Sequence, residues 1–60
     1  MQAIVTISYT HGLRDDDNHV TVTESSYYRA GSGAGEIAEA VEGATRRALA
    51  RAKATINADA

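Results

Sequence analysis

One long amphipathic stretch, residues 36–57, limits what this chain can fold into. Placed around a helix at ~100° per residue, its apolar and small side chains fall on one broad face, opposite the charged ones. That face consists of Ile37, Ala38, Val41, Ala44, Thr45, Ala48, Leu49, Ala52 and Ile56. Because it is wider than the seam of a coiled coil, it suits packing on a sheet. The pattern predicts a C-terminal helix over about residues 35–57.

The order of charges along this stretch supports the same prediction. Acidic residues come first and basic residues follow: Glu36, Glu39 and Glu42, then Arg46, Arg47, Arg51 and Lys53. This order complements the dipole of a helix. Glu42 also precedes Arg46 by four residues, which is the favourable orientation for an ion pair on a helix surface.

Two segments with alternating polarity precede the helix. In residues 1–10 the inward set includes Val5 and Ile7, and in residues 19–28 it includes Val20 and Val22. A period of two and β-branched side chains indicate strands. We therefore predict an α+β fold of the order β-β-α, in a single domain spanning residues 1–60. An antiparallel β-hairpin (about 1–10 and 19–28) is packed by one long C-terminal helix (about 35–57).

The predicted core is thin. The sixty residues include no cysteine, phenylalanine or tryptophan. The expected core residues are Val5, Ile7, Val20, Val22, Ile37, Val41, Ala44, Ala48, Leu49 and Ile56. At ~25 cal/mol per Å² such small side chains contribute little, and a domain of this length is marginal alone. We expect oligomerisation to complete the fold, most simply as a homodimer. The copies would pair through sheet edges or through a row of small residues on the helix: Ala40, Gly43, Ala44, Ala50 and Ala54.

Composition excludes several classes of protein. The net charge of −2 argues against non-specific binding to nucleic acid or to an anionic membrane. There is no long apolar run and no basic N-terminal region, so we expect neither a membrane span nor a signal peptide, and a cytoplasmic location. No nucleophile can be matched with a base and an orienting group. We expect a protein that is not an enzyme and has no cofactor.

The glycine-rich segment before the helix is one candidate binding feature. Backbone N–H groups at a helix N-terminus attract anions, and Gly33 and Gly35 would let a ligand approach closely. Glu36 in the first turn would repel a phosphate. A flexible link that simply starts the helix is the favoured interpretation.

Arginine and tyrosine side chains form the second candidate site. Arg47 and Arg51 lie one helical turn apart and could grip a phosphate or carboxylate, with Arg29 added by a dimer. Tyr27 and Tyr28 suit an interface or ligand stacking, and one of them should face inward. The alternative is that the arginines are solvated and complement the helix dipole.

A cluster in and beside the predicted hairpin loop is a candidate metal site. It consists of His11, Asp15, Asp16, Asp17 and His19. These residue types can bind divalent metals, but no known loop spacing is met. We expect a solvated acidic turn and no metal.

These observations favour a small non-enzymatic binding module that acts as a homo-oligomer. It would hold a protein partner or a small anionic ligand at or near a subunit interface, as an inhibitor or ligand-sequestering protein does. One alternative is a nucleic-acid-binding dimer using the Arg-rich half of the helix. The outward strand positions argue against it, because they carry short neutral side chains that read bases poorly. The other alternative is a structural oligomerisation subunit.

Overall fold

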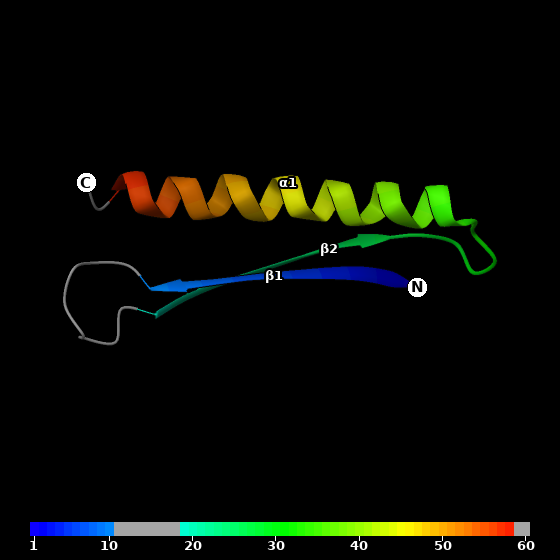
Figure 1. The fold of residues 1–60 in the computed structure, drawn as a ribbon, viewed down its shortest axis with the longest axis horizontal. Coiled ribbons are helices and arrows are strands. Elements are labelled where there is room, and N and C mark those ends of the chain that lie inside the picture. The colour runs from blue at the N-terminus through cyan, green and yellow to red at the C-terminus, as the bar shows by residue number, and fades with distance from the viewer. Residues whose placement is uncertain (11–18, 59–60) are drawn as a thin grey trace.

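The chain folds into two layers, a two-stranded sheet and one helix (Figure 1). A computed structural model describes residues 1–10 and 19–58. Strand β1 spans Gln2–Thr10, strand β2 spans His19–Tyr27, and helix α1 spans Ala34–Ala58. The predicted β-β-α order and α+β class are confirmed, and each boundary lies within one residue of the one expected. Helix α1 runs in the same direction as β1, so the start of β1 and the end of α1 lie at opposite ends of the molecule (Figure 1).

The two strands are antiparallel and paired along their whole length, from Gln2 opposite Tyr27 to Thr10 opposite His19. Burial alternates as the sequence pattern predicted, with the odd residues of β1 and the even residues of β2 turned toward the helix. The outer face is hydroxyl-rich: the Thr6 and Thr23 hydroxyl oxygens lie 3.4 Å apart. The sheet therefore has one face covered by α1 and one face open.

A short connection leads from the sheet to the helix. Tyr28 is half-buried whereas Tyr27 is 80% exposed, so the tyrosine expected to face inward is Tyr28. Gly31 adopts a φ of +85°, a conformation that other residues rarely accept. The helix begins after Gly33, whose carbonyl accepts the first α-helical bond, from the Ile37 N–H at 3.1 Å.

Small side chains make up the core. The buried apolar residues in the described part of the chain are Ala3, Val22, Ala44, Ala48 and Ala52. Val22, Ala48 and Ala52 form one cluster, with Val5, Ile7, Tyr9 and Val20 packed half-buried around it. The alanines bring the helix backbone close to the sheet, but they remove little apolar surface from water. The thin core expected from the sequence is therefore present.

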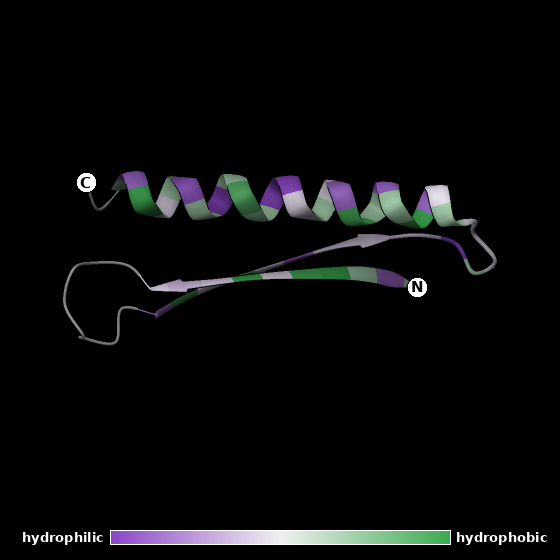
Figure 2. Ribbon diagram, in the orientation of Figure 1, coloured by the Kyte–Doolittle hydropathy of each residue, from purple (hydrophilic) through white to green (hydrophobic). Residues whose placement is uncertain are grey.

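Three residues predicted to be core are exposed, whereas Val5, Ile7, Val20 and Ile37 are half-buried. Val41, Leu49 and Ile56 are 42%, 46% and 42% exposed. The apolar face of the helix is broader than a two-stranded sheet, so the sheet covers only the alanine row at its centre. Figure 2 shows the apolar parts of α1 turned toward the sheet and the hydrophilic parts turned away. The expectation for these three residues was wrong because periodicity gives the direction of a face, but not the width of the surface that covers it.

Candidate functional site

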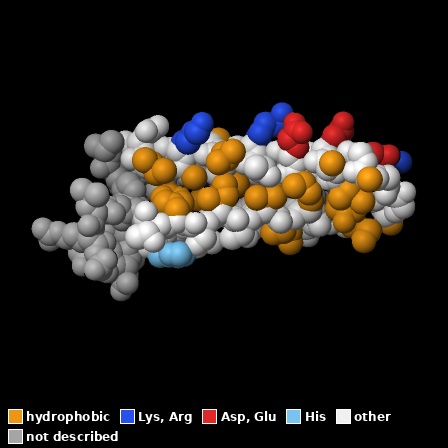
Figure 3. Space-filling view, viewed as in Figure 1, with side chains coloured by type: hydrophobic (Ala, Val, Ile, Leu, Met, Phe, Trp, Pro, Cys, Tyr) orange, Lys and Arg blue, Asp and Glu red, His pale blue; other side chains and the backbone are white. Residues whose placement is uncertain are grey.

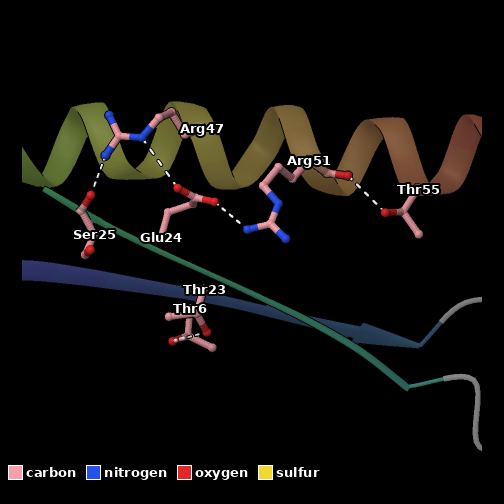
Figure 4. Close-up of polar contacts among 7 residues, drawn as sticks. All are labelled: Thr6, Thr23, Glu24, Ser25, Arg47, Arg51 and Thr55. Carbon is pink, nitrogen blue, oxygen red and sulfur yellow. Dashed lines mark hydrogen bonds and ion pairs between the residues drawn. The ribbon is translucent and has the colours of Figure 1, made fainter.

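The main polar cluster joins the middle of β2 to the helix (Figure 4). Arg51 Nη1 lies 2.5 Å from Glu24 Oε2, and Arg47 Nε lies 3.5 Å from Glu24 Oε1. Arg47 Nη2 also donates to the Ser25 carbonyl at 2.5 Å and to the Ser26 hydroxyl at 2.7 Å. Glu24 thus lies between two arginines one helical turn apart, and one of these also binds the backbone of β2.

This arrangement changes the acid–base properties of Glu24. The hydrogen bond from Arg51 lowers the pKa of the carboxyl group below its ordinary value, and the charges of Arg51 and Arg47 act in the same direction. Partial burial of the side chain, which is 19% exposed, acts against this shift. Glu24 is therefore held as a carboxylate between the helix and the sheet.

Glu24 was not singled out by sequence reasoning, although the sequence contains a signal for it. It continues the inward-facing series of Val20 and Val22 on β2, where an acidic side chain is unexpected. An acid at such a position requires a cationic partner. The two arginines one helical turn apart, Arg47 and Arg51, are the side chains that supply it.

The residues predicted to bind a ligand fall into two places. Arg47 and Arg51 are together at Glu24, and their side chains are 51% and 64% exposed. The other predicted residues lie at the far end of the sheet and beyond it: Tyr27 ends β2, Tyr28, Arg29 and Gly33 belong to the connection, and Gly35 lies in the first turn of α1. In the described residues no hydrogen bond or ion pair between side chains links the two groups. Binding of a ligand at either place stays a prediction.

Two further predictions concern the helix: an ion pair of Glu42 with Arg46 and a close contact at Gly43. The predicted pair of Glu42 and Arg46 is present at 3.3 Å on the exposed side of the helix. Gly43 lies toward β2, where an added Cβ would meet Arg47 Nη1 and the Ser26 hydroxyl at 3.6 Å, an ordinary contact. A helix–helix contact at this glycine stays a prediction.

The proposed metal cluster lies almost wholly outside the described residues, which include only His19. His19 Nε2 lies 2.5 Å from the Ser8 hydroxyl. Within residues 1–10 and 19–58 there is no group of three or more potential metal-binding side chains. No pocket is found over the same part of the chain, and no helix there is long and apolar enough to cross a membrane.

The exposed apolar residues of the helix form a second candidate site, which we call the apolar flank: Val41, Leu49 and Ile56. Around the helix axis, Leu49 and Ile56 lie on the opposite side of the buried alanine row from Arg47 and Arg51, and Val41 lies in line with that row nearer the helix start. Because the arginines reach over β2, the apolar flank lies on the side of β1. Figure 3 shows hydrophobic side chains in a band along the molecule, below the charged ridge of the helix.

The outer edge of β1 lies beside this flank. The Tyr28 N–H donates to the Met1 carbonyl at 3.0 Å, which makes Met1 and Tyr28 a hydrogen-bonded pair. Hydrogen-bonded and non-bonded pairs alternate in an antiparallel ladder. The even-numbered residues of β1, Gln2 to Thr10, therefore direct their N–H and C=O groups away from β2, toward an edge that no described strand covers.

The two edges of the sheet differ in how they are protected. Strand β1 contains no charged residue and no proline, the usual means by which proteins protect an edge strand. By the same alternation, the Ser25 carbonyl points outward from β2, where Arg47 binds it. Part of the β2 edge is thus capped, whereas β1 presents nine uncharged residues.

Comparison of the chain with protein-family models, with curated proteins and with solved structures gives no match.

Proposed function

We propose that this chain is a small non-enzymatic protein-binding module that acts as a homo-oligomer. The observation that carries the proposal is the uncharged open edge of β1, which lies beside the apolar flank of α1. An extended strand that adds to such an edge gains main-chain hydrogen bonds, and exposed apolar side chains beside it add contact area. We therefore expect this surface to bind another polypeptide chain.

The state of the arginines favours a protein partner over an anionic ligand. Arg47 and Arg51 already bind Glu24, and Arg46 binds Glu42. A phosphate or a nucleic-acid backbone would have to compete with these carboxylates. At the β1 edge, by contrast, the groups that lack a partner among the described residues are apolar side chains and backbone groups, which suit a polypeptide.

Native mass spectrometry and thermal unfolding over a range of protein concentrations test the proposal. At micromolar concentration we expect a mass of two chains. The melting temperature should rise with concentration, because association stabilises only the folded state. A single-chain mass with a melting temperature independent of concentration would refute the proposal.

A further inference from the structure

We propose that a second copy of this chain pairs with the open edge of β1, antiparallel to it, to form a four-stranded sheet of the order β2-β1-β1-β2. Both helices then lie side by side on one face of that sheet. This inference rests on the proposed function and specifies the surface through which the copies meet.

The edge of β1 is complementary to itself. A two-fold axis at Thr6 pairs all nine residues of the strand: Gln2 lies opposite Thr10 of the second copy, and Ile4 opposite its Ser8. The even-numbered residues that direct their backbone groups outward then form the hydrogen-bonded pairs. No charged side chain is brought near a like charge, because the strand contains none.

Two contacts fix the position of the helix along the sheet. An added Cβ at Gly43 would lie 3.6 Å from the Ser26 hydroxyl, so this part of the helix lies over Ser26. Ala48 and Ala52 pack on Val22 in one cluster. The helix therefore advances by about two turns between these two points on β2.

The pairing register of β1 with β2 relates these helix positions to residues of β1. Ser26 lies opposite Ala3, and Val22 lies opposite Ile7. Interpolation along the helix at ~1.5 Å per residue, against ~3.3 Å per residue in the strand, places Leu49 at the level of Thr6. The axis that gives the longest strand pairing thus passes beside the central residue of the apolar flank.

The apolar flank is also nearly symmetrical about that axis. Val41 precedes Leu49 by ~12 Å along the helix and Ile56 follows it by ~10 Å, at ~1.5 Å per residue. In an antiparallel pair of helices, Leu49 meets Leu49 of the second copy. Val41 then lies against Ile56 of that copy. The three residues that the monomer leaves exposed become one contact.

The spacing of the helices fits this contact. Helix α1 lies over both strands of its own hairpin. Strands are ~4.8 Å apart, so two adjacent hairpins place their helices two strand spacings apart, roughly 9 to 10 Å. Helices that pack against each other have axes ~8–10 Å apart. Pairing of the strands and packing of the helices are therefore compatible.

Two single-cysteine variants test the geometry in a chain that has no cysteine of its own. In Thr6→Cys, the Cα atoms of the two copies would lie ~5.5 Å apart, within disulfide range. In Thr23→Cys, the matched control at the register partner of Thr6, they would be three strand spacings apart, roughly 14 Å. We expect Thr6→Cys to form a covalent dimer on mild oxidation at least tenfold faster than Thr23→Cys, measured by mass under non-reducing conditions.

Each other outcome has a definite meaning. Faster linkage of Thr23→Cys would place the contact at the β2 edge and overturn the inference. A dimer by native mass in which both variants link slowly would overturn edge pairing but leave the proposed function standing. A single-chain mass for the unmodified protein would overturn both.

A second pair of variants tests the helix contact. Leu49→Glu brings two carboxylates together at the axis, whereas Ala50→Glu places the same charge on the exposed side of the helix. Leucine, alanine and glutamate are all good helix formers, so neither change should disturb the helix itself. We expect the dissociation constant of the dimer to rise at least tenfold for Leu49→Glu and to stay unchanged for Ala50→Glu, measured by sedimentation equilibrium. Equal dissociation constants would overturn this part of the inference.

Discussion

Replacement of Ala48 by leucine tests whether the thin core is closely packed or underfilled. Ala48 is fully buried and packs on Val22, which is 5% exposed. If space remained between helix and sheet, a larger side chain would fill it and stabilise the protein. If the alanine row sets the distance between the layers, three additional carbon atoms must displace the helix.

The structure favours the second outcome, and its magnitude can be estimated. Overpacking a close-packed site costs about 1–3 kcal/mol. A domain of sixty residues has a total stability of roughly 3–9 kcal/mol, so Ala48→Leu removes a large fraction of it. A loss of about 2 kcal/mol lowers the melting temperature by roughly 8–16 °C at this size.

Circular dichroism during heating and urea titration, at one fixed protein concentration, measures the effect. Ala50→Leu is the matched control, because Ala50 is exposed on the same helix and a surface change of this kind stays within about 0.5 kcal/mol. If Ala48→Leu were as stable as Ala50→Leu, the alanine row would not determine the distance between the layers, and the packing argument would be refuted.

Three further changes test other parts of the fold. Because the pKa of Glu24 is lowered in the folded state, its stabilisation is present above the ordinary carboxyl pKa and is lost as the pH falls through the lowered value. In scans of melting temperature against pH, the fall in melting temperature at acid pH should therefore be smaller for Glu24→Gln than for the unmodified protein, and unchanged for the control Glu39→Gln. Equal slopes for the two variants would contradict the role of the two arginines. In urea titration, Gly31→Ala should lower the free energy of unfolding by about 1–2 kcal/mol, because Gly31 has a φ of +85°. The control Gly35→Ala, at a glycine with open space around it, should raise the free energy of unfolding by up to about 1 kcal/mol. Similar effects of the two changes would argue against the left-handed turn. Tyr9→Phe removes a buried hydroxyl that has no hydrogen-bond partner in the described part of the chain. Urea titration should therefore show a free energy of unfolding that is unchanged or raised. A loss above about 1 kcal/mol would mean that the hydroxyl is hydrogen-bonded.

Elements of this fold could be predicted because their signals are local. Alternation in the strands and the 3.6-residue period of the helix are properties of neighbouring residues. The strand side chains that alternation predicts to face the helix, such as Val20 and Val22, do face it in the structure. Exposure of Leu49 could not be predicted in the same way. It depends on how far the sheet extends beneath the helix, which is a property of the whole fold.

The candidate site shows the same limit. The pairing of Glu42 with Arg46 follows from their spacing on one helix and was predicted. The contacts of Arg47 and Arg51 with Glu24 connect residues more than twenty positions apart. They depend on the register of β2 under the helix, which the periodicity of either element alone does not determine.

The shared direction of β1 and α1 has a consequence for engineering. In one chain the start of β1 and the end of α1 lie at opposite ends of the molecule (Figure 1). In the two-fold arrangement that we propose, the helix end of each copy comes beside the strand start of the other. A short flexible linker could then join two copies in tandem, which would replace association in solution by an effective concentration in the millimolar range. Such a fusion would fold at dilutions at which separate chains dissociate.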